Sequence, residues 1–194
     1  MISFLSGILV HRSPTELVID CNGIGYAVHI SLTTFGKLPA SGAVKVLTHQ
    51  HFTENNQQLF GFYEEHERAL FRQLISVSGI GPNTALLMLS SMEPNEIHRA
   101  IVNEREDLLV ALKGIGAKTA KRLIVELKDK LMKTGMKTEA MPAGNFPAHS
   151  EALTALISLG FNRISSENAL AKAARETDQH QGVEELIKLA LRNL

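Results

Sequence analysis

The sequence predicts an α+β protein of several domains: a small β-barrel, an all-α region, a flexible linker and a final three-helix domain. The first third contains short runs of Val, Ile, Leu and Phe separated by turn residues, which is typical of strands. A Gly-Ile-Gly sequence between apolar helical segments occurs twice in the middle third. A later stretch with two Pro, two Gly and no apolar period indicates a linker. The predicted parts are residues 1–63, 64–133, 134–149 (the linker) and 150–194.

The first part has five strand-like runs and room for one helical turn at Leu32–Leu38, between the third run and the fourth. Five short strands interrupted once by a helix are typical of a Greek-key barrel of the OB type, a fold that often binds nucleic acid. The expected strands are Ile2–Val10, Thr15–Asp20, Tyr26–Ile30, Val44–Phe52 and Gln58–Phe62.

The aromatic and histidine side chains of the barrel are expected to be structural. We expect Phe4, Phe60 and Phe62 to lie in the core, because they fall at strand-core spacing. Aromatic platforms for stacking single strands are therefore not predicted. His49 and His51 are expected to face solvent, with no carboxylate at ligand spacing.

The two glycine sequences, Gly79-Ile80-Gly81 and Gly114-Ile115-Gly116, are offset by 116 − 81 = 35 residues, the size of one repeated supersecondary unit. Each unit is predicted to be a helix, a hairpin and a second helix, with the Ile filling the gap between the helices. We expect Gly114 and Gly116 to allow a positive φ and to leave no Cβ in the way of a ligand. One copy alone is as consistent with a purely structural helix cap. Two copies resemble the helix-hairpin-helix motif, which holds the phosphates of a duplex without reading its bases.

The helix after the second hairpin is predicted to be basic on one face and apolar on the other. Lys118, Lys121 and Arg122 share one face at spacings of three and four residues. A helix N-terminus rimmed by cations suits a phosphate. The opposite face carries Ala120, Leu123, Ile124, Leu127 and Leu131. The candidate DNA-binding residues are Gly79, Ile80, Gly81, Asn83, Thr84, Gly114, Ile115, Gly116, Lys118, Thr119, Lys121 and Arg122.

The net charge of the chain is zero, but the charge is unevenly distributed. Residues 64–107 carry four Arg and eight acids, which gives −4, whereas residues 113–137 carry seven Lys and one Arg against two acids, which gives +6. A basic face on a neutral or acidic body attracts DNA at that face, and the binding should weaken with salt.

The composition excludes several other classes of protein and site. The only cysteine, Cys21, leaves no internal disulfide or Cys-based metal site, and we expect no metal and no cofactor. No apolar run is long enough to span a membrane, and the start of the chain lacks the basic region and cleavage site of a signal peptide. We therefore expect a cytoplasmic protein that does not bind membranes.

Residues 150–194 read as three short helices with a small core. Ser150 is expected to cap the first helix and Gly160 to end it. Leu159 and Phe161, beside that glycine, are expected either to pack in the core or to be partly exposed and bind a partner protein.

The order and spacing of these parts resemble the RuvA family across essentially the whole chain. The stretches that carry the resemblance are Gly23–Val28, Gln58–Phe62, Ser78–Pro82 and Gly114–Asp129. The resemblance implies a non-catalytic protein of DNA recombination and repair, which forms a homotetramer, or an octamer of two facing tetramers, and holds a four-way DNA (Holliday) junction open. It also implies that a UBA-like third domain recruits the hexameric ATPase RuvB for branch migration, and that the nuclease RuvC acts on the same junction.

The resemblance also assigns roles to residues of this chain. Both hairpins would grip the duplex arms, and Glu54 and Asn55 would form an "acidic pin" at the four-fold centre that keeps the strands apart. Family members can carry two adjacent acids there, so the single Glu54 gives half the negative charge. Asn83 and Ala117 are neutral where family members can present Lys. The RuvB-facing residues would be Leu159, Gly160 and Phe161.

Two other readings remain. A base-excision glycosylase or lyase also uses a Gly-Ile-Gly hairpin, but it needs a catalytic Asp, usually with a Lys, at a base-flipping pocket. Here Lys118 and Asp129 lie about three turns apart on one predicted helix. The other reading is a scaffold subunit of a different repair complex, which assembly into a tetramer would distinguish. No Walker motif is present, so we expect no ATPase activity in this chain.

Overall fold

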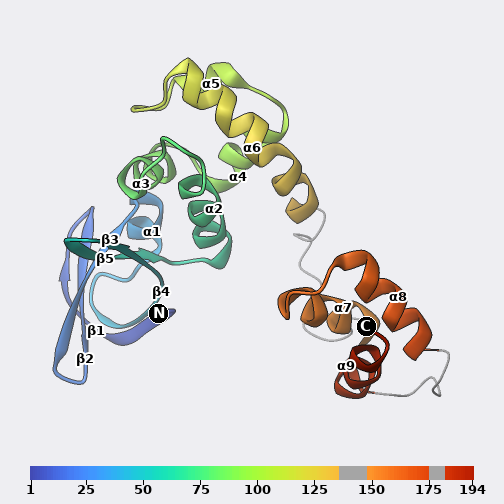
Figure 1. Ribbon diagram of the computed structural model, residues 1–194. Coiled ribbons are helices and arrows are strands. Elements are labelled where there is room, and N and C mark those ends of the chain that lie inside the picture. Colours follow the sequence, from blue (N-terminus) through green and yellow to red (C-terminus); the bar gives the residue numbers. More distant parts are fainter. Residues whose placement is uncertain (136–147, 175–181) are drawn as a thin grey trace. The chain divides into compact units, whose positions relative to one another are not determined.

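The computed structural model describes residues 1–135, 148–174 and 182–194 (Figure 1). The chain divides into two compact units, residues 1–138 and 139–194, and each is described by itself. Of the predicted linker, residues 136–147 lie outside the described part. Its first two residues belong to helix α6 (Ala117–Gly135), and its last two to helix α7 (Ala148–Ser158).

The first unit begins with a closed five-stranded barrel, as the OB-type prediction requires. The strand order is β1-β2-β3-β5-β4, with β3 and β5 parallel and the other neighbours antiparallel. Its interior is filled by Leu17, Ile19, Val28 and Val46, all fully buried. The strands are β1 (Phe4–Arg12), β2 (Glu16–Cys21), β3 (Ile24–Ile30), β4 (Gly42–Thr53) and β5 (Asn56–Phe62).

Helix α1 (Leu32–Lys37) connects β3 to β4 at the predicted place and joins the barrel to the helical region. Ser31 caps it, with its Oγ accepting a hydrogen bond from the Thr34 N–H at 2.9 Å. The hydroxyls of Ser31 and Thr34 both donate to the carboxylate of Glu67, a fully buried residue of helix α2 (Glu65–Ile75). Burial raises the pKa of Glu67 above its ordinary value, although both hydrogen bonds act in the opposite direction.

The aromatic residues of the barrel follow the prediction only in part. Phe60 and Phe62 are fully buried, as expected. Phe4, however, is 53% exposed, and its ring lies 4.8 Å from the Lys45 Nζ, so placing it in the core was wrong. His49 is not free in solvent either, because its ring packs edge-on against Phe71 of α2, with centroids 5.5 Å apart.

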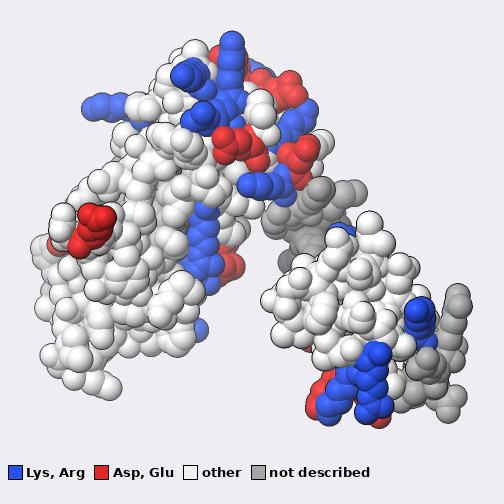
Figure 2. All heavy atoms as spheres, in the orientation of Figure 1, with Lys and Arg blue, Asp and Glu red and all other residues white. Residues whose placement is uncertain are grey.

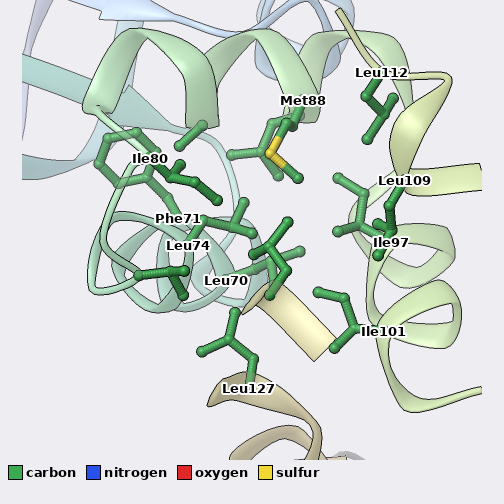
Figure 3. Close-up of a cluster of buried hydrophobic side chains, with 14 of the residues drawn as sticks. Leu70, Phe71, Leu74, Ile80, Met88, Ile97, Ile101, Leu109, Leu112 and Leu127 are labelled. Carbon is green, nitrogen blue, oxygen red and sulfur yellow. The ribbon is translucent and has the colours of Figure 1, made fainter. Parts of the chain in front are cut away.

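Five helices complete the first unit, and their apolar faces converge on one core (Figure 3). In that view the side chains of α2, α3, α4, α5 and α6 point toward one another. The helices after α2 are α3 (Pro82–Ser91), α4 (Pro94–Val102), α5 (Glu106–Val110) and α6. The labelled core residues are Leu70, Phe71, Leu74, Ile80, Met88, Ile97, Ile101, Leu109, Leu112 and Leu127.

The second unit is the predicted three-helix domain, made of α7, α8 (Arg163–Ala173) and α9 (Val183–Arg192). Its core is small: among the described residues of this unit, the six buried apolar ones include four alanines. Gly160 ends α7 as expected: it has φ +98°, its N–H donates to Ile157 O, and the Phe161 N–H donates to Leu156 O. Ser150 is not the cap, since α7 begins two residues before it.

Within the described residues, no helix is long and apolar enough to cross a membrane.

Candidate nucleic-acid interface

The two glycine hairpins have the same backbone hydrogen bonds, offset by 35 residues. The Ile80 N–H donates to Val77 O at 3.1 Å, and the Ile115 N–H donates to Leu112 O at 3.1 Å. Both Ile side chains are buried, so they fill the space between the paired helices as predicted. The second half of each unit begins in the same way. The Ala85 N–H donates to Gly81 O at 3.0 Å, and the Ala120 N–H to Gly116 O at 2.9 Å.

The glycines of each hairpin serve two different purposes. Gly79 and Gly114 have φ values of +96° and +90°, which favour glycine for backbone reasons. Gly81, at φ −86°, and Gly116 are not in the left-handed region, so the expected positive φ of Gly116 was wrong. A Cβ added at either residue would meet no protein atom within 4 Å. Packing within the protein therefore does not require glycine at these two positions. A ligand that approaches the backbone closely would require it, because a Cβ would occupy the same space.

Each of these second glycines stands directly before a helix, where backbone amides face outward. The amides of Ala117, Lys118 and Thr119 precede the first helical hydrogen bond, so they have no carbonyl of their own helix to donate to. Asn83 and Thr84 occupy the same place in the first unit, after Pro82, which has no N–H. Both helix starts present amide donors and the positive end of a helix dipole, which suits an anion.

The three predicted basic side chains do not have the same surroundings. Lys118 and Lys121 are exposed. Arg122 is exposed as well, but it donates from Nη1 to Ser78 O at 3.1 Å, and its Nε lies 3.6 Å from Glu126 Oε1. Arg122 therefore links the second hairpin to the first, in addition to carrying charge. Figure 2 shows that Lys and Arg side chains gather over the region of α5 and α6, with Asp and Glu side chains among them, whereas the barrel in this view is largely white.

The two hairpins lie side by side. Besides the link from Arg122 to Ser78, a Cβ at Gly114 would lie 3.6 Å from Thr84 Cγ2, at van der Waals distance. The candidate DNA-binding residues come from two separate parts of the sequence. The fold brings them together at the N-terminal ends of α3 and α6. The sequence did not predict the hydrogen bond from Arg122 to Ser78, because every residue has a backbone carbonyl that could accept it.

Glu54 and Asn55 form the two-residue turn between β4 and β5, and both are exposed. Thr53 pairs with Asn56 in register at the base of this turn, and the Thr53 Oγ1 donates to Asn56 O at 3.2 Å. These residues belong to the barrel and are not part of the hairpin cluster. Phe52, the preceding residue of β4, is 62% exposed and was not predicted as a site.

The second unit has an exposed apolar surface around the end of α7. Leu159 is 62% exposed and Phe161 is 38% exposed, so the alternative of simple core packing is wrong for this pair. Ile157 and Ile164 add two further exposed apolar side chains, which the sequence reading did not select. Gly160, between the first two, has open space where a Cβ would be.

The geometry does not favour the glycosylase reading. Lys118 and Asp129 are both exposed on the single helix α6. A hollow of about 290 Å³ lies between α4 and α5, lined by Met92, Glu96, Arg99, Ala100, Asn103, Arg105 and Leu108, and neither residue of the candidate pair lines it. Among the described residues, no group of three or more His, Cys, Asp or Glu could hold a metal ion.

Three family models match successive parts of the chain. Residues 1–61 match the RuvA N terminal domain, residues 71–129 the SAM-like helix-hairpin-helix tandem, and residues 147–194 the RuvA C-terminal domain. The chain is similar over its full length to proteins named Holliday junction branch migration complex subunit RuvA. Identity is 46% to those of Christiangramia forsetii and Flavobacterium psychrophilum and 41% to that of Bacteroides fragilis, and all of each relative is covered.

Proposed function

The chain belongs to the RuvA family, and from this premise we propose that it is the DNA-binding subunit of a Holliday junction branch migration complex, acting in recombination and DNA repair. The observation that carries the proposal is the pair of adjacent hairpins with open glycine backbones, outward amides and a basic rim. Such a surface suits phosphates at two neighbouring points of one duplex, and phosphate contacts carry no sequence information.

The residues proposed to hold the duplex arms come from both hairpins. Backbone contacts are assigned to the glycines and to the amides after them, and charge to Lys118 and Lys121. Arg122 would act mainly by fixing one hairpin against the other, as its hydrogen bond to Ser78 supports.

In the proposed assembly four copies surround the junction, or eight as two facing tetramers. The turn at Glu54 and Asn55 would then stand at the four-fold centre, where a carboxylate repels phosphates and keeps the strands apart. With one acid per chain, this repulsion is weaker than that of a turn with two acids.

The motor for branch migration would be a separate subunit. We assign ATP hydrolysis to RuvB, recruited through Leu159, Gly160 and Phe161 of the second unit, whose exposed apolar surface suits a protein partner. RuvC would act on the same open junction, and the complex would work in the cytoplasm on DNA.

The proposal is tested with two four-way junctions of equal arm length and unrelated arm sequence, titrated with the protein at fixed salt. Because phosphate contacts carry no sequence information, the two dissociation constants should agree within about twofold. A tenfold or larger preference for one sequence would contradict a grip that uses the backbone alone.

A further inference from the structure

The exposed ring of Phe52 lies at the base of the proposed pin. Phe52 pairs in register with Gln57, directly below the pair formed by Thr53 and Asn56. It precedes Glu54, the first residue of the turn, by two residues. With 62% of its surface accessible, Phe52 is an apolar residue in one of the most exposed parts of the barrel.

The turn and the start of the facing strand carry polar, exposed residues. Asn55, Asn56 and Gln57 are exposed, and Gln57 is the register partner of Phe52, whereas Leu59 and Phe60, further along β5, are buried. A surface that docks another protein is usually apolar over several neighbouring side chains. An exposed ring with an exposed amide residue as its register partner instead suits a nucleobase, which has an apolar face for stacking and polar edges for hydrogen bonds.

The charge of the turn favours the same ligand. The carboxylate of Glu54 repels phosphate groups that approach the turn, but a base carries no charge at neutral pH. Moving the branch point also requires base pairs to open there, because each base leaves one partner before it pairs with the next. The Glu54 carboxylate would therefore repel phosphates near the turn, but it would not repel an unpaired base that approaches the Phe52 ring.

We propose that Phe52 is a stacking platform for an unpaired base at the crossover of the junction. This inference rests on the proposed function, because only that function brings a crossover to the β4–β5 turn. Phe52 stabilises the open junction through the base, while Glu54 acts on the backbone.

The test is permanganate oxidation of thymines placed at the crossover of a junction bound by the full chain. Permanganate attacks the face of an unstacked thymine, so stacking on a ring protects it. The Phe52→Ala variant should raise crossover reactivity severalfold, and Phe52→Trp should keep the protection. The matched control is Phe4→Ala, since Phe4 is similarly exposed on the same barrel but lies far from the turn. Junction affinity of Phe52→Ala should fall by at least about fivefold.

Equal reactivity of the crossover thymines in the wild type and in Phe52→Ala, at a level above that of paired DNA, would overturn the stacking role but leave junction opening intact. Unreactive crossover thymines in both proteins would mean that these bases stay stacked without Phe52, which overturns the stacking role, whereas loss of junction binding itself would overturn the proposed function. A loss of assembly mass by Phe52→Ala without DNA, measured by light scattering, would make Phe52 a protein contact and also overturn the inference.

Discussion

The guanidinium of Arg122 donates a hydrogen bond to the backbone carbonyl of Ser78, 3.1 Å away and 44 residues earlier in the chain. This bond joins the helix after the second hairpin to the start of the first. The Oε1 of Glu126, one turn further along α6, lies 3.6 Å from the Arg122 Nε. A side chain that the sequence marks only as basic thus links the two hairpins, for which we propose phosphate binding.

Arg122→Ala should lower both stability and junction affinity. Removal of one such hydrogen bond should reduce the free energy of unfolding by about 1 kcal/mol. Lys121→Ala, at the neighbouring exposed position, should change it by less than about 0.5 kcal/mol. Urea unfolding of both variants at equal m-value measures the difference, and equal losses would contradict the bracing role of Arg122.

Replacing Lys118 and Lys121 together by Ala should reduce the salt dependence of DNA binding. If each neutralises one phosphate, the slope of log K against log salt should become shallower by about 1.8 per bound chain. Lys188→Ala is the control, since Lys188 lies in the second unit with its Nζ 2.7 Å from Glu184 Oε1. An unchanged slope for the double variant would show that these lysines do not neutralise DNA phosphates.

Gly116→Ala should impair DNA binding more than folding. The added methyl group meets no protein atom, and the loss of a glycine at a helix N-cap destabilises by no more than about 1 kcal/mol. The same methyl group would occupy the space that a phosphate needs, so junction affinity should fall by tenfold or more. Comparison with Gly114→Ala separates the effects, because a positive φ makes that change destabilising in itself. Normal DNA binding by Gly116→Ala would show that the ligand does not approach this backbone.

Glu67→Gln should change how stability depends on pH. Burial raises the pKa of Glu67 in the folded state, so the folded protein holds this proton more tightly than the unfolded chain does. The stabilisation is complete below the ordinary value of 4.5 and is lost as pH rises through the raised pKa. The free energy of unfolding of the wild type relative to Glu67→Gln should therefore fall as pH rises through this window. A difference that rises or stays constant across it would contradict the assignment.

A chain that ends at Gly135 should bind the junction as well as the full chain does, but should not stimulate branch migration by RuvB. The double variant Leu159→Ala and Phe161→Ala should show the same loss in the full chain, because both side chains are exposed and are not needed for the core. A branch-migration assay with purified RuvB measures this stimulation. Full stimulation by the truncated chain would show that the second unit does not recruit RuvB. Full stimulation by the double variant would show that these two side chains do not.

The repeat was predictable because its signals are local. Glycines at fixed offsets, an Ile between them and an apolar period of 3.6 define each hairpin within about twenty residues, and Gly160 ends α7 by the same kind of rule. The barrel was predictable in class for a similar reason, since five short runs and one helical turn leave few alternatives.

The errors arose where the outcome depends on residues far away in the sequence. Strand β1 is apolar at both parities, so its sequence cannot say that Leu5 and Leu9 face inward while Phe4 faces outward. His49 packs on Phe71, and Arg122 binds Ser78, through contacts that only the folded chain creates. The exposure of Phe52 at the turn has the same cause: its strand continues past the end of the barrel core.

The measurement that tests the central claim most directly is a competition gel shift at moderate salt, with a labelled four-way junction and unlabelled linear duplex of equal length. If the protein recognises the geometry of a junction, a hundredfold excess of duplex should leave most of the labelled complex intact. If duplex competes evenly with the junction, the hairpins are a general grip on the DNA backbone, and the chain would be a scaffold of a different repair complex.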